Sequence, residues 1–306
     1  VMAQVLLAVI VLIPLSSFEG VAELAPAAAQ LVRSAQAATR ICALISEDSP
    51  EAAHDIPDSE PVIEARNLSI GWPGGPTLAT GISLTLRPGS SLAIVGASGI
   101  GKTTLLATLT GVIPPKEGQA LINGVPAWGA DRDQVTSLIT MTAEDAHVFA
   151  TSIFENLRVA RASLTRDEAT ELLTRAGLQE WISTLPDGID TPIGSGGTTV
   201  SGGERRRLLM ARALAAPAPI MTIDEASEHL DATTADRLMD TLLTPSPTRA
   251  TLVVTHRLSA LDKADHVLVL AAPQPGACAS VAAYGTHTDV LNALPTYRQA
   301  LDQEEQ

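Results

Sequence analysis

The sequence predicts an α/β fold in which helices cover a largely parallel sheet. Short runs rich in Leu, Ile and Val alternate with helical segments, which is typical of buried parallel strands joined by crossover helices. One of these runs leads directly into a glycine-bearing loop and then a helix-like stretch. The chain has 306 residues, 45% of them hydrophobic, which is ample for a core. The expected buried strands are residues 91–95, 220–223 and 251–255.

The segment 62–86 differs from these runs because its apolar and polar residues alternate. Together with the turn at Pro73-Gly74-Gly75-Pro76, this alternation predicts antiparallel strands. Residues 151–214 have a mostly helical pattern. We therefore expect a parallel core, an antiparallel part and a helical part at about 145–215.

The first fifteen residues form a nearly unbroken apolar run that is interrupted by Gln4 and closed after Pro14. The run is slightly shorter than the roughly 20 residues that span a bilayer, and it lacks the basic region and cleavage site of a signal peptide. Because the chain begins with Val1 rather than Met, we expect the run to be the end of a last transmembrane helix that starts upstream. A buried helix of a soluble domain is the alternative.

Residues 16–45 are rich in Ala with interspersed polar residues, which predicts a helix that continues from the membrane into water. Residues 46–61 are acidic and contain prolines, so they are expected to form a linker with a solvated His54. The expected parts are thus the end of the transmembrane helix with its cytoplasmic extension (1–45), the linker (46–61) and a globular domain (62–306).

Charge and cysteine content argue against a nucleic-acid partner, a disulfide framework and a zinc site. The formal net charge of −14 argues against a nucleic-acid partner, because such proteins neutralise phosphates with a basic face. The two cysteines, Cys42 and Cys278, are far apart and belong to no CxxC or Cys/His cluster. A disulfide framework and a zinc site are therefore not predicted.

The loop after residues 91–95 fits the pattern GxxxxGK[ST], and a helix-like stretch follows it. Glycines let the backbone curl so that consecutive N–H groups point at phosphate oxygens, and the following helix adds the positive end of its dipole. Lys102 is then expected to contact the β- and γ-phosphates of a nucleotide, and the Thr103 hydroxyl to bind Mg²⁺. The expected nucleotide contacts here are Gly96, Ala97, Ser98, Gly99, Ile100, Gly101, Lys102, Thr103 and Thr104.

The run 220–223 ends in an acidic pair, Asp224 and Glu225. An aspartate at the carboxyl end of a buried parallel strand is well placed to hold Mg²⁺ through water near the phosphate loop. The adjacent Glu225 can polarise an attacking water as a general base. A helix N-cap is the alternative role for Asp224.

A third motif, Ser201-Gly202-Gly203-Glu204, precedes the helix-like stretch RRRLLMARALA. It resembles the LSGGQ signature of ATP-binding cassette (ABC) proteins. That resemblance implies a P-loop NTPase with a RecA-like core, an antiparallel β subdomain and a helical subdomain, so that 62–306 is a nucleotide-binding domain. It also implies that Ser201, Gly202 and Gly203 contact the γ-phosphate of ATP bound to the opposite subunit. A flexible loop is the alternative for this stretch.

Further landmarks of the ABC family occur in order along the chain. Trp72 resembles the aromatic residue that stacks on adenine, with a core tryptophan as the alternative. Residues 227–231 resemble the D-loop that lines the dimer seam. His256 matches the switch histidine that hydrogen-bonds the γ-phosphate, with a core histidine as the alternative. The resemblance implies ATP and Mg²⁺ as cofactors, catalytic roles for Glu225, His256 and Lys102, and metal binding by Thr103, Glu144 and Asp224.

Glu144 departs from the pattern of the family. Family members carry a lid glutamine at this position, which contacts Mg²⁺ and links the ATPase to the membrane part. A carboxylate still binds Mg²⁺, but it lacks the amide donor and adds negative charge beside the phosphates. We therefore expect altered turnover, or asymmetry between the two ATP sites.

The apolar start followed by a cassette matches the plan of ABC exporters. The stretches PLSSFEGVAELAPAAAQLVRSAQAATRI and EDAHVFATSIFENLRVA resemble the C subunit (CydC) of the heterodimeric thiol-reductant exporter. That family exports cysteine and glutathione from the bacterial cytoplasm and is needed for cytochrome bd assembly. The resemblance implies a CydD-type second half-transporter as partner, in the bacterial inner membrane, with the ATPase domain in the cytoplasm.

Three alternatives remain open at this point. The chain can be the ATPase half of another exporter, for lipids, peptides or drugs. A soluble ABC protein of translation or DNA repair is disfavoured by the apolar run at residues 1–15. A non-hydrolysing regulatory cassette is disfavoured by the intact catalytic residues, although Glu144 leaves it open.

Overall fold

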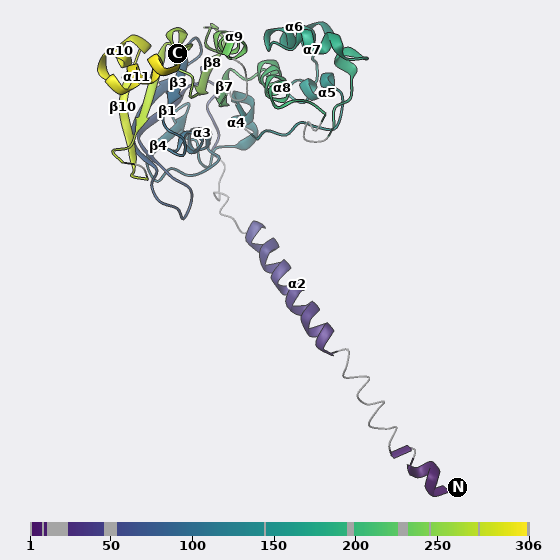
Figure 1. Ribbon diagram of the computed structural model, residues 1–306. Coiled ribbons are helices and arrows are strands. Elements are labelled where there is room, and N and C mark those ends of the chain that lie inside the picture. The colour runs from purple at the N-terminus through teal and green to yellow at the C-terminus, as the bar shows by residue number, and fades with distance from the viewer. Residues whose placement is uncertain are drawn as a thin grey trace. The chain divides into compact units, whose positions relative to one another are not determined.

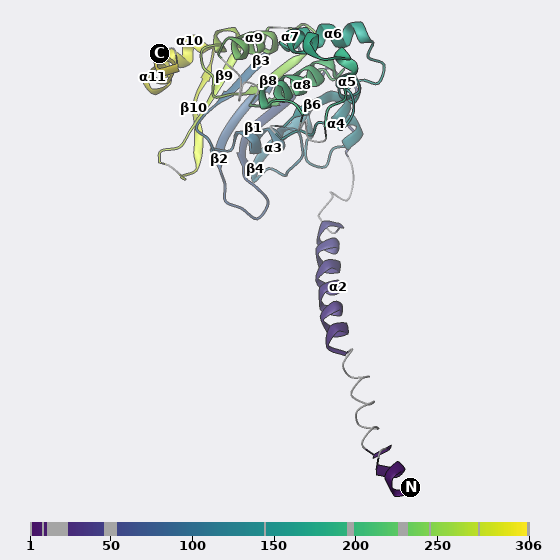
Figure 2. The same cartoon turned by 45° about the vertical axis from the view of Figure 1, so that its right-hand side comes forward.

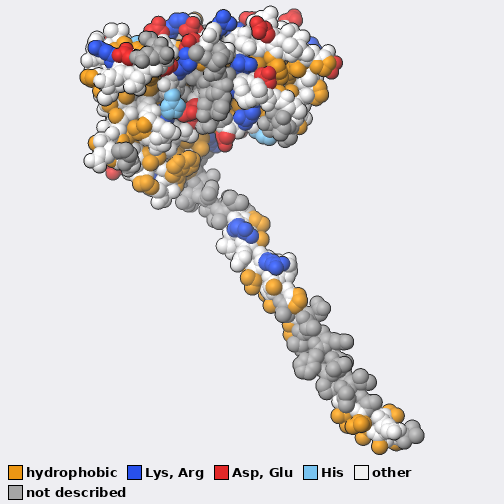
Figure 3. Space-filling view, in the orientation of Figure 1, with side chains coloured by type: hydrophobic (Ala, Val, Ile, Leu, Met, Phe, Trp, Pro, Cys, Tyr) orange, Lys and Arg blue, Asp and Glu red, His pale blue; other side chains and the backbone are white. Residues whose placement is uncertain are grey.

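The computed structural model describes residues 2–7, 9–10, 24–45, 54–143, 145–194, 199–225, 232–244, 246–274 and 276–304. The chain divides into two compact units, residues 1–51 and 52–306. In the first unit, helix α2 (Leu24–Ile45) lies within the segment expected to be helical, and hydrophobic side chains are exposed along it, including Leu24, Leu31 and Ile41 (Figure 3). The part of the chain that the structure describes contains no helix with both the length and the apolar character needed to span a bilayer.

The second unit is built on a ten-stranded sheet with the order β5-β4-β1-β2-β10-β9-β3-β8-β7-β6 (Figures 1 and 2). Because consecutive strands are often not neighbours, helical connections cross between them. The strands are β1 (Ile63–Ile70), β2 (Ala79–Leu86), β3 (Ser91–Val95), β4 (Glu117–Ile122), β5 (Val125–Pro126), β6 (Ile139–Thr142), β7 (Ile220–Asp224), β8 (Ala250–Val254), β9 (His266–Ala271) and β10 (Ala279–Gly285).

The parallel half of the sheet contains the three strands expected from the apolar runs. Strand β3 pairs in parallel with β8 and β9, and β7 pairs in parallel with β8 and β6. Every residue of β3, β7 and β8 is buried. In β3, Leu92 and Ile94 belong to one hydrophobic cluster while Ala93 and Val95 belong to the other, as the alternation of side chains along a strand requires. Both faces of this half are therefore covered.

The antiparallel half confirms the expectation for residues 62–86. Strand β1 pairs antiparallel with β2 and with β4. Strand β10 runs antiparallel to β9 but parallel to β2, where Ala279 lies opposite Ala79, so it joins the two halves. The Ala279 N–H donates to the Leu78 carbonyl at 2.8 Å, which places the loop before β10 beside the turn before β2.

The helical part forms one end of the unit (teal in Figure 1). Buried residues of its helices, such as Leu172 and Leu209, share a hydrophobic cluster with strands of the parallel half. The helices of the unit are α3 (Lys102–Leu109), α4 (Arg132–Leu138), α5 (Ile153–Arg158), α6 (Arg166–Arg175), α7 (Gln179–Thr184), α8 (Gly202–Ala215), α9 (Ala232–Leu243), α10 (His287–Ala293) and α11 (Pro295–Glu304), with short 3₁₀ turns at Gly188–Asp190 and Leu261–Lys263.

The last part of the expected linker packs on this unit. The His54 N–H donates to the Gly129 carbonyl at 2.7 Å, and the Asp131 N–H donates to the His54 carbonyl at 3.0 Å, while the His54 side chain is exposed. Ile56 is buried, and its N–H donates to Gln134 Oε1 at 2.6 Å. A single apolar residue in an acidic, proline-bearing stretch thus anchors the chain before the position expected for the domain boundary.

Candidate functional site

The phosphate loop joins β3 to α3 with a backbone that its glycines make possible. Gly99 and Gly101 have φ values of 75° and 107°, in the left-handed region. A Cβ atom on Gly96 would lie 2.7 Å from the Leu270 carbonyl oxygen. Gly101 is the N-cap of α3 and provides no side-chain hydrogen bond to the first turn. The first N–H groups of α3 are therefore left without a side-chain cap, as an anion-binding helix start requires.

The Lys102 side chain lies inside this loop. It is 5% exposed, and its Nζ donates to the carbonyls of Gly96 at 2.9 Å and Ala97 at 3.0 Å. Burial lowers the pKa of Lys102, while the negative charges of Glu225 and Asp224 act against this shift. The loop thus holds a partly desolvated ammonium group whose hydrogen-bond partners among the described residues are two backbone carbonyls and the His256 ring.

Asp224, the last residue of β7, is 1% exposed. Among the described residues, neither of its carboxylate oxygens has a hydrogen-bond partner. Burial raises the pKa of Asp224, and the Thr103 hydroxyl and the Lys102 ammonium act in the opposite direction. A buried, unpartnered carboxylate near a hydroxyl fits the oxygen ligands that Mg²⁺ prefers.

A complete metal cage is not needed for such an ion. The described residues contain no cluster of three or more His, Cys, Asp or Glu side chains that could hold a metal by themselves. Mg²⁺ keeps several waters and is commonly held by one or two protein groups together with substrate phosphates. Two protein groups such as the Asp224 carboxylate and the Thr103 hydroxyl are therefore compatible with such an ion.

Glu225, His256 and Lys102 form a connected chain of side chains. His256 Nε2 lies 2.7 Å from Glu225 Oε1 and 3.5 Å from Lys102 Nζ. Glu225 has a φ of 52°, which is unusual for a residue other than glycine, and its N–H donates to the Val254 carbonyl at 3.0 Å. Strained backbone of this kind concentrates at functional sites. The structure thus brings together three residues that lie far apart in the sequence.

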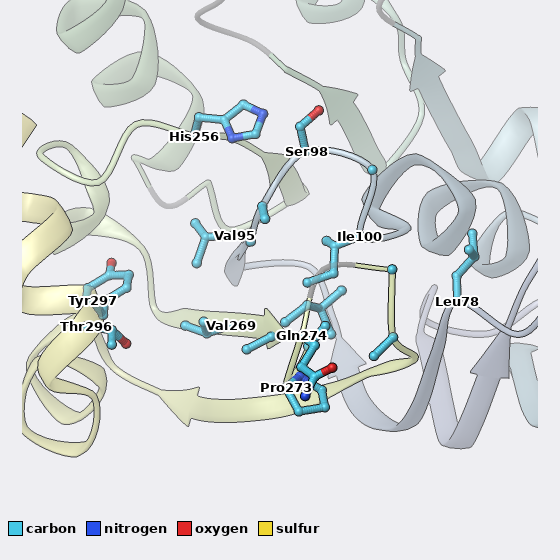
Figure 4. A pocket seen from close by; sticks show the side chains of 18 of the residues that line it. Leu78, Val95, Ser98, Ile100, His256, Val269, Pro273, Gln274, Thr296 and Tyr297 are labelled. Atoms are coloured by element: carbon cyan, nitrogen blue, oxygen red, sulfur yellow. The ribbon is translucent and has the colours of Figure 1, made fainter.

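Two cavities adjoin these residues. One of about 790 Å³ runs past Leu78, Ile100 and Ser98 to His256 (Figure 4). The loop between β9 and β10 and helix α11 form its opposite walls. A second cavity of about 530 Å³ is lined by Ser98, Glu225 and His256 together with residues of α11. The phosphate loop and the acidic residue therefore face open space large enough for a nucleotide's phosphates.

Trp72 lies on the turn that leads to the larger cavity. Its side chain is 53% exposed, so it is not a core tryptophan. The Gly75 N–H donates to the Trp72 carbonyl at 2.9 Å, and Lys116 Nζ donates to the Gly75 carbonyl at 2.8 Å, which fixes the turn. Trp72 itself does not line the cavity, whereas the residues that follow the turn, Pro76 to Leu78, do. The ring is free to stack on a planar ligand.

The motif Ser201-Gly202-Gly203 forms the start of α8 and is not a flexible loop. The Ser201 hydroxyl accepts a hydrogen bond from the Glu204 N–H at 3.2 Å, and Glu204 Oε2 accepts one from the Ser201 N–H at 2.8 Å. This is a capping box. The described residues of the two cavities beside the phosphate loop do not include any of these three residues. The structure therefore does not bring them to the phosphate loop of the same chain.

Some predicted residues lie outside the described part of the chain. Glu144 and the D-loop residues 227–231 are among them. Strand β6 ends at Thr142, opposite Ile223, one residue before Asp224. Glu304 could not be identified from the sequence, because no local pattern links helix α11 to the loop after His256; its carboxylate accepts the Leu258 N–H at 2.7 Å.

Known proteins resemble this chain over most of its length. Residues 79–228 match the profile of a family described as ABC transporter. The mycobactin import ATP-binding/permease protein IrtB of Mycolicibacterium thermoresistibile is 34% identical over 84% of this chain and 44% of its own length. The ATP-dependent lipid A-core flippase of Chromobacterium violaceum is 33% identical, with the same coverage of both chains.

A solved structure of an ABC exporter also resembles this chain. The structure of a bacterial Atm1-family ABC exporter with ATP bound matches 84% of this chain with a TM-score of 0.73 and 30% identity. It is matched over 44% of its own length. The chain thus spans less than half the length of each of these proteins.

Proposed function

Because this chain carries an ABC ATPase domain of the exporter type, we propose that it binds and hydrolyses Mg·ATP as one half of a membrane transporter. The observation that carries the proposal is the row of three connected side chains, Lys102, His256 and Glu225, beside the phosphate loop. It combines a cation for phosphates with a carboxylate for a water molecule, which is what phosphoryl transfer to water requires.

The loop binds the anionic end of the nucleotide. Backbone N–H groups of residues 96–103 and the uncapped start of α3 point at phosphate oxygens, and Lys102 exchanges the Gly96 and Ala97 carbonyls for them. Thr103 and Asp224 hold Mg²⁺, which neutralises charge on the phosphates when it is bound. Because Asp224 is already buried, it gives up little hydration when it takes up this role.

Glu225 acts as the general base. Its carboxylate orients a water molecule for in-line attack on the γ-phosphorus and takes up the proton of that water as the bond to ADP breaks. His256, hydrogen-bonded to Glu225 Oε1, keeps the carboxylate in place and contacts the γ-phosphate. Removal of bulk water from this space strengthens both interactions.

The remaining predicted contacts complete the proposed site. Trp72 stacks on adenine, and Glu144 supplies the contact to Mg²⁺ that a glutamine supplies in the family. Ser201, Gly202 and Gly203 contact the γ-phosphate of the ATP held by a second subunit, which agrees with their absence from the cavities of their own chain. Two such subunits then enclose two ATP molecules between them.

Nucleotide binding by the full chain tests this function. We expect the purified chain to bind ATP in the presence of Mg²⁺ and Lys102→Ala to lose that binding. Trp72→Ala should weaken binding by about 5- to 150-fold, which corresponds to roughly 1–3 kcal/mol of stacking. Trp72→Phe, which keeps an aromatic face, is the matched control. A wild-type chain that takes up no ATP with Mg²⁺ would contradict the proposal.

The cargo and the partner are a finer proposal. We propose export of thiol reductants, cysteine or glutathione, with a CydD-type partner in the bacterial inner membrane, the ATPase domain lying in the cytoplasm and the export supporting cytochrome bd assembly. The support is the resemblance of the two stretches at residues 14–41 and 144–160. The relatives named above handle a mycobactin and lipid A-core by their descriptions, so another cargo is the competing proposal. ATP-dependent uptake of labelled glutathione by inside-out vesicles that contain the chain and its partner decides between them.

A further inference from the structure

The loop that carries His256 is held by a carboxylate from the C-terminal helix. After β8 the chain leaves the sheet. The Thr255 N–H still donates to the Ile94 carbonyl of β3 at 3.2 Å, whereas the N–H groups of Arg257 and Leu258 donate to side chains. The Leu258 N–H donates to Glu304 Oε2 at 2.7 Å, and the Ser259 hydroxyl donates to Glu304 Oε1 at 2.9 Å. Both oxygens of one side chain thus bind two consecutive residues, which restricts the loop more than a single hydrogen bond does.

Arg257 fastens the same loop from the other side. Its Nε donates to Asp236 Oδ1 on α9 at 2.8 Å, and the same Nε lies 3.7 Å from Glu304 Oε1. The Arg257 and Glu304 side chains are both 21% exposed, so water screens this contact only in part. Helices α9 and α11 therefore flank the residue that directly follows His256.

Helix α11 is a firm support for this contact. Tyr297 in its first turn is 5% exposed, and its hydroxyl lies 3.0 Å from His287 Nδ1 at the start of α10. Arg298 Nη2 donates to the Leu291 carbonyl at 2.8 Å. The helix is thus fixed at its first turn on α10 and contacts the His256 loop with its last residue, Glu304.

The position of Glu304 is not explained by the stability of its own helix. A carboxylate at a helix C-terminus interacts unfavourably with the helix dipole, and the last turn of α11 contains no basic residue to offset it. Replacement of Glu304 by Ala therefore does not weaken α11 itself. Among the described residues, this carboxylate makes the hydrogen bonds to Leu258 and Ser259 and the longer contact with Arg257.

Space is available for the loop to move when this contact is lost. The cavity of about 530 Å³ lies between His256 and Glu225 on one side and Ala300 and Glu304 of α11 on the other. Figure 4 shows that Thr296 and Tyr297 of α11 and His256 also face a common space. Since the bond between His256 Nε2 and Glu225 Oε1 is 2.7 Å long, a shift of about 1 Å would break its geometry.

We propose that Glu304 is a positioning residue for the switch histidine: it fixes the loop at Leu258 and Ser259 so that His256 meets Glu225. This inference rests on the proposed ATP hydrolysis for its kinetic consequence, but its structural content does not depend on it. The C-terminal helix then sets how often the two side chains are aligned for the chemical step.

The experiment compares four variants of the full chain. Glu304→Ala removes both acceptors, while Glu304→Gln keeps a carbonyl oxygen for the Leu258 N–H and an amide that can donate to Ser259. Ser259→Ala removes one of the two bonds to Glu304, together with the longer 3.4 Å contact of the Ser259 hydroxyl with Asp236 Oδ1, without any change to α11. Asp302→Ala removes an exposed carboxylate from the same turn of α11 and is the matched control.

The first readout is the imidazole signal of His256 in a ¹⁵N spectrum recorded without nucleotide and assigned with His256→Gln. We expect Glu304→Ala to shift and broaden this signal, Ser259→Ala to shift it less, and Glu304→Gln and Asp302→Ala to leave it at the wild-type position. A signal that Glu304→Ala leaves unchanged overturns the inference. This result is obtained even if the chain hydrolyses no ATP, in which case the proposed function fails separately.

The second readout is phosphate release. We expect Glu304→Ala to lower kcat by about tenfold, since displacement of a catalytic group by about 1 Å can reduce a rate by up to about a hundredfold. The KM for ATP should stay unchanged because the phosphate loop is untouched. Glu304→Gln should restore most of the rate. Because a loss of folded chain also lowers the apparent kcat without a change in KM, the rate is divided by the folded fraction measured by circular dichroism. A corrected rate equal to that of wild type overturns a positioning role.

Discussion

Two helices of this domain begin directly after glycine-bearing segments, and they begin in opposite ways. Helix α3 starts at the phosphate loop, where Gly101 offers no side-chain cap and a Cβ atom on it would lie 3.2 Å from the Leu78 Cβ. Helix α8 starts at Ser201, which forms a capping box with Glu204 and so provides the partner for the Glu204 N–H of the first turn. A Cβ atom on Gly202 would meet nothing within 4 Å.

The two helix starts differ in the way expected if α3 binds a ligand with residues of its own chain and α8 contributes to a site that a second subunit completes. At α3 the chain itself requires the glycine and leaves the N–H groups of the helix start for a ligand. At α8 none of the described residues gives a steric reason for Gly202, which fits a glycine kept for a molecule outside the chain. This agrees with the proposed approach of a second subunit's ATP to the start of α8.

The largest expected effect is on the chemistry at the phosphate loop. Glu225→Gln should lower phosphate release by about 10²- to 10⁴-fold, because the amide cannot accept the proton of the attacking water. ATP binding should persist. The matched control at the other helix is Glu204→Gln, since Gln also serves in capping boxes, and its rate should stay close to wild type. Equal losses in both variants would show that the carboxylate at the start of α8 takes part in the chemistry as much as Glu225 does.

The two glycines provide the most direct comparison. Gly101→Ala places a side chain at a φ of 107°, which costs about 1–2 kcal/mol in free energy of unfolding, and pushes it against Leu78. Gly202→Ala should instead raise the free energy of unfolding by up to about 1 kcal/mol, because Ala is the better helix former. Thermal unfolding and ATP binding of the two variants measure this.

The assembled transporter adds a second test of the same pair. Gly202→Ala should reduce ATP hydrolysis only when the chain is paired with its second half, whereas Gly101→Ala should weaken ATP binding by the chain alone. If Gly202→Ala weakened ATP binding by the isolated chain, the two helix starts would belong to one site.

The phosphate loop could be predicted from the sequence because its chemistry is local. Residues 96–103 are contiguous, and the strand and helix that flank them have clear patterns, so their structure follows from short-range rules. Strands β3, β7 and β8 begin and end within a residue of expectation for the same reason. The cap at Ser201 and the antiparallel pairing of residues 62–86 also depend on neighbouring residues or one turn.

Contacts across the fold could not be predicted in this way. Glu225 and His256 are 31 positions apart, and Leu258 and Glu304 are 46 apart, so only the crossing of β7, β8 and α11 brings each pair together. The packing of residues 54–56 was hidden because Ile56 stands alone in a polar stretch. The composition of a segment is an average over its residues. The start of this domain depends instead on the buried Ile56 side chain and on the two backbone hydrogen bonds of His54.

The buried carboxylate of Asp224 beside the phosphate loop lowers the free energy of unfolding. Burial raises the pKa of Asp224 above its usual 3.8, so the folded chain holds this proton more tightly than the unfolded chain does. Stability therefore falls as the pH rises from below 3.8 through the pKa of the folded state, and the full loss applies at neutral pH.

Asp224→Asn removes this charge. We expect the variant to melt at a higher temperature than wild type at neutral pH, with the difference shrinking as the pH is lowered through that window. Its Mg²⁺-dependent ATP binding should be weaker, as is common where a functional group is held at the expense of stability. Equal melting temperatures at neutral pH would show that the buried carboxylate is not a destabilising charge.

The smallest expected effect lies at the start of α8. Ser201→Ala removes the acceptor for the Glu204 N–H and should lower the free energy of unfolding by about 1 kcal/mol, or roughly 2–4 °C in melting temperature for a domain of this size. Ser201→Asp, which also caps well, should restore stability but place a negative charge where the second subunit's γ-phosphate is proposed to lie. A folded and stable Ser201→Asp chain that binds ATP alone, yet fails to hydrolyse it when paired, would separate the cap from the contact between subunits. Normal hydrolysis in the pair would instead assign Ser201 to the helix alone.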